Sequence, residues 1–342
     1  MTINELKEKF LAQYTMASEF TKSKYRQDLE LFLSVCKISS VEDLNSLQDK
    51  GIGNFYEYSK QKGWSPGTIN QRLGIAKLFT SWAFNKHFIN TDFLCDIKKI
   101  RTSNSVRYTP SDEECDKLIT YIKEHTTKQR LYLMTSLLLK CGLRRSEVCN
   151  LKVGDVDENA SSLKVFGKGK KIVEQPVPRA LMSQIVDYIH TERKEVIGKY
   201  ISMGGKDLDY LFLSGIGESC DVSKKNLKNG NQVDSNAFYQ QIKRYAKLSG
   251  MQNAEKLSPH GLRRAAGTRI YNQTGDINTA KEFLRHSNIT TTEQCYINYN
   301  RDKIRKAVDT ISEQKNLIVE TKPTNNEEYE LYLLLKKKFA SI

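Results

Sequence analysis

Five short motifs beyond residue 140 carry side chains that could act on a phosphate. In chain order they are Gly142-Leu143-Arg144-Arg145-Ser146-Glu147, Gly167-Lys168-Gly169, His260-Gly261-Leu262-Arg263, Leu284-Arg285-His286 and Cys295-Tyr296. Arginine, lysine and histidine donate charge-assisted hydrogen bonds to phosphate oxygens, and a tyrosine hydroxyl can act as a nucleophile. Phosphodiester transfer needs a nucleophile, charge compensation and a proton donor for the leaving oxygen, and this set could supply all three.

Taken one at a time, these motifs are also compatible with ordinary structural roles. Ser258-Pro259 predicts a helix start, which places His260 and Arg263 on one face near the positive end of that helix, where a phosphate fits. The same pair could simply be solvated basic groups, and Lys168 a solvated residue of a turn. Tyr296 is one of 17 tyrosines and could equally be a core or surface aromatic.

The composition favours a polyanionic partner. With 54 Lys and Arg residues against 40 Asp and Glu residues, the formal net charge is +14, which suits contacts to phosphates with release of counterions. Nucleic acid is the first candidate partner and a membrane surface the second. No apolar run approaches the ~20 residues that span a bilayer, and the N-terminal MTINELKEKF lacks the apolar segment of a secretory signal. We expect a soluble chain in the cytoplasm.

Two common classes of cofactor site are not indicated. The seven cysteines are dispersed, with no CxxC pair or regular spacing that would suggest a disulfide framework or a zinc site. Residues 167–170 lack the GxxxxGK[ST] spacing of a nucleotide-binding loop and lie between strand-like runs. We therefore expect neither a metal nor an organic cofactor.

The hydrophobic pattern predicts a mainly α-helical protein with a small β-sheet. Residues 1–100 show helical spacing, with about four helices, and residues 101–110 form a polar linker. A second domain over 111–312 combines helices with two strands, at 163–166 and 172–177, joined by a hairpin turn. Residues 210–213 could add a short strand. A tail over 313–342 contains an amphipathic helix.

The ordered motifs resemble those of the tyrosine recombinase family, which includes the Xer, Cre and phage integrase proteins. The resemblance is carried by GLRRSE, FGKGKK, LSPHGLRRA, LRHSN and QCYINY. SPGTINQRLGIAKLFTSWA is in turn similar to the end of that family's helical core-binding domain. The resemblance implies a helical, SAM-like core-binding domain followed by an α+β catalytic domain.

Residue by residue, the family's catalytic positions fall on Arg144, Lys168, His260, Arg263, His286 and Tyr296. Tyr296 follows His286 by ten positions, a familiar spacing among integrases. A spacing of nine would select Cys295, which is not the family's nucleophile, and Tyr299 is the reserve candidate. Arg285 stands where the family usually has glycine, and Arg264 where a second histidine is common.

The resemblance implies a mechanism without ATP or metal. Tyr296 would attack the scissile phosphate to form a 3′-phosphotyrosine, while Arg144 and Arg263 hold its oxygens. Lys168 would protonate the leaving 5′ oxygen. His260 would accept or orient a proton near the nucleophile, and His286 would donate a hydrogen bond to the phosphate.

The implied partners are double-stranded DNA sites, clamped by both domains, with four protomers assembled on two recombining sites. Integration, excision and resolution are all compatible with this pattern. Two other functions remain open from the residues. One is a DNA-binding regulator on a degenerate recombinase scaffold, and the other is a topoisomerase of the related tyrosine class.

Overall fold

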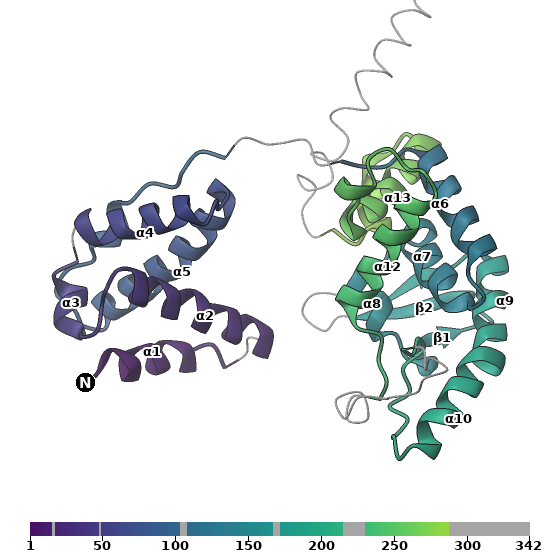
Figure 1. Cartoon of the computed structure of the whole chain (residues 1–342), viewed down its shortest axis with the longest axis horizontal. Coiled ribbons are helices and arrows are strands. Elements are labelled where there is room, and N and C mark those ends of the chain that lie inside the picture. The colour runs from purple at the N-terminus through teal and green to yellow at the C-terminus, as the bar shows by residue number, and fades with distance from the viewer. Residues whose placement is uncertain (16–17, 48, 103–107, 167–171, 215–229, 287–342) are drawn as a thin grey trace, which may run out of the picture. The chain divides into compact units, whose positions relative to one another are not determined.

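The computed structural model describes residues 1–15, 18–47, 49–102, 108–166, 172–214 and 230–286 (Figure 1). The chain divides into two compact units, Met1–Val106 and Arg107–Ile342, and the division falls within the predicted linker. The exact predicted domain limits stay predictions. Lys168 with its hairpin turn, Tyr296, Tyr299 and the predicted C-terminal helix lie outside the described residues.

The first unit is entirely helical over its described residues. Its elements are α1 (Ile3–Ala12), α2 (Glu19–Val35), α3 (Val41–Asn45), α4 (Asp49–Gln61), α5 (Pro66–Asn85) and the 3-10 helix η1 (Phe93–Asp96). Phe10, Phe32, Phe55 and Phe79 fill its core and are fully buried. Helix α5 follows a serine cap, because the Ser65 hydroxyl accepts a hydrogen bond from the Thr68 amide.

The second unit surrounds a buried central helix, α7 (Gln129–Lys140). Leu133, Leu137 and Leu138 of α7 are fully buried, and the helix packs against α6, α8, α9, α12 and α13. The bounds of the other elements are α6 (Asp112–His125), α8 (Arg145–Asn150), η2 (Val153–Asp155), α9 (Arg179–Tyr188), η3 (Ile189–Arg193), α10 (Lys194–Ser202), α12 (Ser235–Leu248), η4 (Ala254–Lys256), α13 (Pro259–Thr274) and α14 (Ile277–Phe283).

A small antiparallel sheet with the order β1-β2-β3 completes the second unit. Its strands are β1 (Val156–Asp157), β2 (Ser162–Phe166) and β3 (Ile172–Pro176). Strands β2 and β3 confirm the predicted hairpin strands, and Phe166 pairs with Ile172 at the end nearest residues 167–171. Residues 210–213 form only isolated bridges, Lys152 to Tyr210 and Leu213 to Gln232, because neither partner runs alongside them far enough to build a ladder. The mainly helical fold with a small sheet is confirmed.

No helix among the described residues combines the length and apolar character that crossing a bilayer requires. The five described cysteines are free thiols, and all except Cys95 are buried. Burial raises the pKa of Cys115 and of Cys141 to about 12, so both thiols are protonated at neutral pH.

Gly142 makes the close approach between the ends of α7 and α14 possible. It follows α7 with φ +58°, in the left-handed region that glycine adopts readily. A Cβ atom at this position would lie 2.8 Å from Cε1 of Phe283 and 3.0 Å from Cδ2 of Leu284. Glycine is therefore required here both by backbone conformation and by packing.

Replacing Gly142 should destabilise the second unit more than replacing a glycine with the same conformation in open space. Gly142→Ala should lower the free energy of unfolding by about 2–4 kcal/mol, because left-handed strain and overpacking add. Gly275→Ala is the matched control, with φ +71° and nothing within 4 Å of the new Cβ, and should cost about 1 kcal/mol. Urea unfolding of both variants measures the difference, and equal losses would contradict the packing argument.

Candidate active site

Four of the six predicted site residues lie in the described structure, and all four lie near one another, because besides burial the charges of Arg263, Arg144 and His260 each lower the pKa of His286. Arg144, Arg263 and His286 converge where the end of α7, the start of α8, α13 and the turn after α14 meet. His260 lies on the first turn of α13 and is exposed. Lys168 and Tyr296 are outside the described residues, so their predicted places in the site are untested.

Arg144 is held at the start of α8 by Glu147. The carboxylate of Glu147 accepts hydrogen bonds from the Arg144 backbone amide, at 2.7 Å, and from its Nη1, also at 2.7 Å. The side chain of Glu147 is 7% exposed, whereas that of Arg144 is 34% exposed. Glu147 therefore fixes the backbone and one guanidinium nitrogen of Arg144, while part of the guanidinium stays accessible.

Arg263 is buried on α13, one turn beyond the helix start. Ser258 caps this helix by accepting a hydrogen bond from the Gly261 amide at 3.0 Å, as the Ser-Pro pair predicted. The Arg263 guanidinium donates to the carbonyl oxygens of Gly142 and Leu284. Arg263 is 3% exposed, because its guanidinium satisfies the free carbonyls at two neighbouring chain turns, so the alternative that it is a solvated basic group does not hold.

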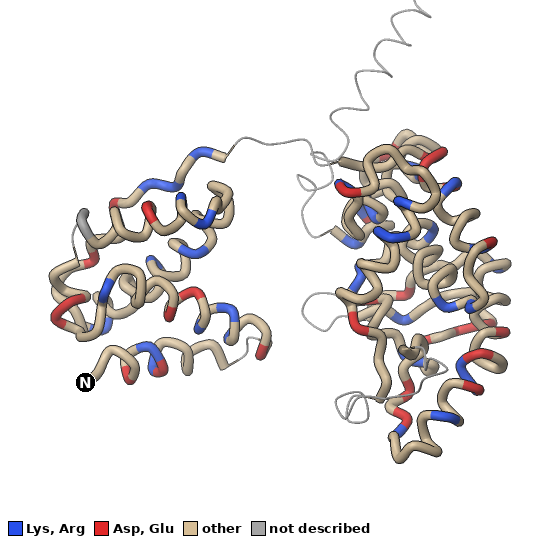
Figure 2. The backbone as a smooth tube through the Cα atoms, in the orientation of Figure 1, with Lys and Arg blue, Asp and Glu red and all other residues tan. Residues whose placement is uncertain are grey.

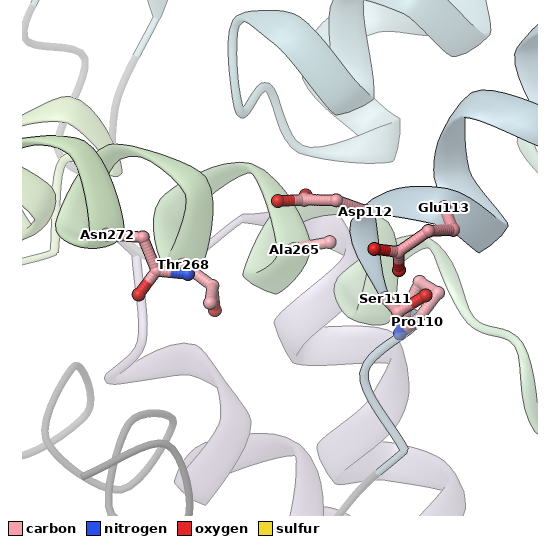
Figure 3. Close-up of a pocket in the computed structure, with 7 residues that line it drawn as sticks. All are labelled: Pro110, Ser111, Asp112, Glu113, Ala265, Thr268 and Asn272. Carbon is pink, nitrogen blue, oxygen red and sulfur yellow. The ribbon is translucent and has the colours of Figure 1, made fainter. Parts of the chain in front are cut away.

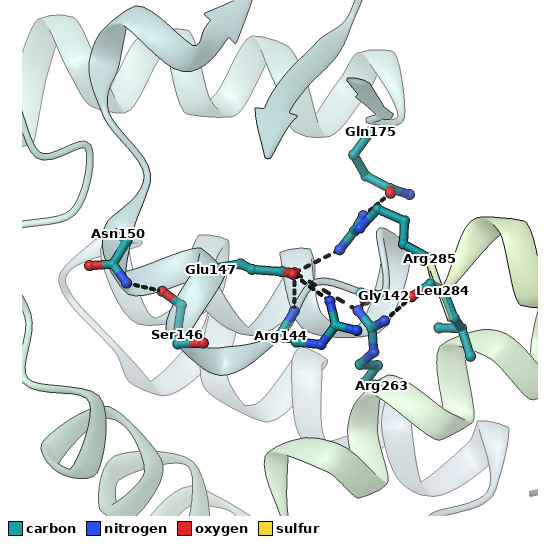
Figure 4. A network of polar contacts seen from close by, with 9 residues as sticks. All are labelled: Gly142, Arg144, Ser146, Glu147, Asn150, Gln175, Arg263, Leu284 and Arg285. Carbon is teal, nitrogen blue, oxygen red and sulfur yellow. Dashed lines mark hydrogen bonds and ion pairs between the residues drawn. The ribbon is translucent and has the colours of Figure 1, made fainter. Parts of the chain in front are cut away.

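Arg285 belongs to the same cluster, although its sequence position suggested only a departure from the family pattern. Its Nη2 lies 2.6 Å from Oε2 of Glu147, and its Nη1 donates to Oε1 of Gln175 on β3. Figure 4 shows the guanidinium groups of Arg144, Arg263 and Arg285 directed toward the single carboxylate of Glu147. No local pattern predicts this convergence, since the three arginines come from separate elements.

The cluster carries an excess of positive charge. Nη1 of Arg263 lies 3.9 Å from Oε2 of Glu147, so three guanidinium groups share one carboxylate, for a net +2 (three minus one). Burial alone raises the pKa of Glu147, but the charges of Arg285 and Arg144 outweigh it and hold that pKa below its ordinary value. An anion such as a phosphate would balance the remaining charge.

His286 is neutral at physiological pH. Burial lowers its pKa to about 4, and the charges of Arg263, Arg144 and Arg285 add to the effect. A neutral imidazole has one N–H donor and one acceptor nitrogen. His286 can therefore donate a single hydrogen bond to an anion without adding charge to the cluster.

Arg264, the second departure from the family pattern, serves the start of the unit. Its Nη2 donates to the Tyr108 carbonyl at 2.6 Å, and its Nε to the Thr109 hydroxyl at 2.9 Å. Arg264 thus attaches the first described residues of the second unit to α13.

A small pocket between the start of α6 and α13 is a weaker candidate site. Its lining residues are Pro110, Ser111, Asp112, Glu113, Ala265, Thr268 and Asn272 (Figure 3). Its two charged residues are acidic, which disfavours a phosphate. None of the predicted catalytic residues lines it. Within the described part of the chain, no group of His, Cys, Asp and Glu has the arrangement of a metal site.

Comparison with known proteins relates both units to one family. The sequence model of the phage integrase family matches residues 110–303, and that of the phage integrase N-terminal SAM-like domain matches residues 8–87. The tyrosine recombinase XerC of Caldanaerobacter subterraneus subsp. tengcongensis is 33% identical over 275 residues, which cover 78% of this chain and 70% of that protein. The tyrosine recombinase XerD of Rickettsia bellii is 25% identical over 90% of this chain and 96% of its own.

Two solved structures share the fold. The Tn1549 transposon integrase in complex with a circular intermediate DNA has a TM-score of 0.67 at 17% identity, and covers 90% of this chain and 99% of its own. A lambda integrase dimer bound to a COC′ core site has a TM-score of 0.61 at 17% identity, over 86% of this chain and 95% of its own.

The lowered pKa of His286 predicts a loss of stability in mild acid. Between pH 6.5 and about 4, the unfolded chain takes up a proton at His286 that the folded chain excludes, so stability falls as pH falls through this window. His286→Asn should make the fall shallower in urea unfolding, with exposed His87→Asn as the control. An imidazole NMR signal of His286 that titrates near pH 6.5 would contradict the assignment.

Proposed function

Because the chain belongs to the phage integrase family of tyrosine recombinases, we propose that the Glu147 cluster binds the scissile phosphate of its DNA substrate. The chain is a site-specific DNA recombinase, an enzyme that breaks and rejoins DNA strands. The observation that carries the site assignment is the net positive cluster of Arg144, Arg263 and Arg285 around one buried carboxylate. It supplies charge where a phosphorane transition state gathers it.

The two family arginines differ in how they can serve the phosphate. Arg144 has the more accessible guanidinium. Its outer N–H groups can donate to the phosphate oxygens while Glu147 holds its backbone amide. Arg263 is anchored to the carbonyls of Gly142 and Leu284, and it contributes charge from a rigid position. Rigid donors stabilise a developing charge without reorganising during the reaction.

Tyr296 is the proposed nucleophile. Its hydroxyl oxygen forms a bond to phosphorus as the bond from phosphorus to the 5′ oxygen breaks, which leaves a 3′-phosphotyrosine and a free 5′-hydroxyl. Lys168 donates the proton to the leaving oxygen, and exposed His260 accepts or orients the tyrosine proton. Neutral His286 donates one hydrogen bond to a phosphate oxygen. Attack by a 5′-hydroxyl from another strand reverses these steps, so the bond energy is conserved.

The proposed substrate is double-stranded DNA, with residues 1–100 as a core-binding domain, a linker over 101–110, a catalytic domain over 111–312 and a tail over 313–342. Lys and Arg are spread along the helices of both units (Figure 2), as the net charge of +14 allows for contacts to many phosphates. A lambda integrase tetramer bound to a Holliday junction shares the fold, with a TM-score of 0.62. It supports a homotetramer on DNA as the working assembly, and a cytoplasmic location would bring that assembly to its substrate.

The nucleophile is tested by trapping the covalent intermediate. The substrates are nicked duplexes that carry the sequence of the DNA flanking the gene. Tyr296→Phe should abolish the covalent adduct on them, because phenylalanine has no hydroxyl to attack the phosphate. Denaturing gel electrophoresis of substrates labelled at the 5′ end of the cleaved strand measures the adduct, because that fragment stays attached to the protein. A mobility shift confirms that DNA binding persists.

Tyr299→Phe is the matched control, since it removes the same hydroxyl three positions later, and should still form the adduct. An adduct that persists in Tyr296→Phe and disappears in Tyr299→Phe would move the nucleophile to Tyr299.

A further inference from the structure

Arg285 occupies a backbone position that ordinarily belongs to glycine. It follows α14 with φ +51°. Its amide donates to the Glu282 carbonyl at 2.9 Å, and the next amide, of His286, donates to the Lys281 carbonyl at 3.1 Å. This pair of bonds defines a Schellman helix end, where a residue other than glycine costs roughly 1–2 kcal/mol. At Arg285 this backbone cost goes with side-chain contacts that glycine could not make.

The side chain of Arg285 joins three elements that are far apart in the sequence. It is 8% exposed. One nitrogen contacts Glu147 at the start of α8 at 2.6 Å, and the other donates to Gln175 on β3. Gln175 is 2% exposed and pairs with Leu163 of β2. A planar guanidinium can hold both partners at once, which a lysine ammonium at the same place would do with less fixed geometry.

The contact with Gln175 reaches the strands on either side of Lys168. Strand β2 ends at Phe166 and β3 begins at Ile172, and these two residues pair. Lys168 lies between them in the sequence. The paired strands fix where the segment that carries Lys168 leaves and re-enters the sheet. Movement of β3 relative to α8 would therefore move the proposed proton donor relative to Arg144.

We propose that Arg285 is a positioning residue of the recombination reaction, which ties the β2–β3 hairpin to the arginine cluster through Gln175 and Glu147. This inference rests on the proposed function, in which Lys168 protonates the leaving oxygen and Arg144 binds the phosphate. Arg285 acts through the hairpin, so its loss should impair leaving-group protonation more than phosphate binding.

A substrate whose leaving group needs no proton separates these two effects. In a nicked duplex with a 5′-bridging sulfur at the scissile position, the leaving group is a thiolate, which departs unprotonated because thiols are far stronger acids than alcohols. Single-turnover formation of the 3′-phosphotyrosine adduct is measured for the oxygen and sulfur substrates, with the full-length protein and each variant.

Arg285→Gly should form the adduct about 10- to 100-fold more slowly than wild type on the oxygen substrate. The loss on the sulfur substrate should be markedly smaller, because there only the lost charge of the arginine cluster slows the reaction. The variant relieves the backbone strain at this helix end, so loss of folding is not the expected cause. Gln175→Leu keeps the contact of Arg285 with Glu147 and removes the one with β3, and should show the same selective loss.

Lys37→Gly is the matched control. Lys37 ends α2 with φ +55° and the same pair of hydrogen bonds, from its amide to Ser34 and from the Ile38 amide to Leu33, but its side chain is exposed. Lys37→Gly relieves the same kind of strain and removes one positive charge, but does so away from the cluster. It should leave the rates on the oxygen and sulfur substrates unchanged. Arg144→Ala should slow both substrates, since it removes phosphate binding.

Equal losses of Arg285→Gly on the two substrates would overturn the proposal, and so would wild-type rates on both. Combining Arg285→Gly with Gln175→Leu should slow the oxygen reaction no more than either change alone, whereas independent, multiplying losses would overturn the coupling through β3. Lys168→Ala tests the proposed function separately: an equal loss on both substrates would reject Lys168 as the proton donor, while the double variant still decides the role of Arg285.

Discussion

The arginine cluster depends on the ion pairs that the buried carboxylate of Glu147 forms with it. Three guanidinium groups surround this carboxylate, from the start of α8, from α13 and from the turn after α14. Without that negative charge, three partly or fully buried cations would repel one another at close range, and burial would further disfavour each of them. The single carboxylate of Glu147 allows the three arginines to lie together, but it balances only one of their three positive charges. That deficit suits a site that must hold a phosphate.

Helix ends bring the arginines to this point. Gly142 turns the chain after α7 and leaves its carbonyl oxygen free to accept from Arg263. The Leu284 carbonyl at the end of α14 accepts from the same guanidinium. Carbonyl groups at helix C-termini lack partners within the helix, so an arginine that satisfies two of them also joins the two helices. The cluster is thus part of the packing of the unit, and its geometry is set before any substrate arrives.

The electrostatics of the cluster also assign a character to each nearby group. His286 stays neutral because burial and the surrounding arginines disfavour its protonated form. Arg144, with the greatest exposure of the three arginines, is the one able to reach outward. Arg263 is held by the Gly142 carbonyl, and Arg285 is held by the Gln175 side chain. A single cluster therefore combines a partly exposed donor, buried charge and a neutral hydrogen-bonding ring.

The amino-acid sequence by itself determined the local features of this protein. Ser258 caps the helix whose start the Ser258-Pro259 pair predicts, and Ser65 and Ser111 cap α5 and α6 in the same way, because a cap and its amide partner lie within one turn. The two strands at the predicted hairpin follow from the strand-forming residues of 163–166 and 172–177. The ordered motifs identify the family, and that match also assigns roles to Lys168 and Tyr296, whose places in the site remain predictions. Tertiary structure alone decided which groups meet. Arg263 and Gly142 are 121 residues apart in the sequence, and the burial of Arg263, the shared use of Glu147, the place of Arg285 and the neutral state of His286 all depend on contacts between elements, which no pattern of neighbouring residues encodes.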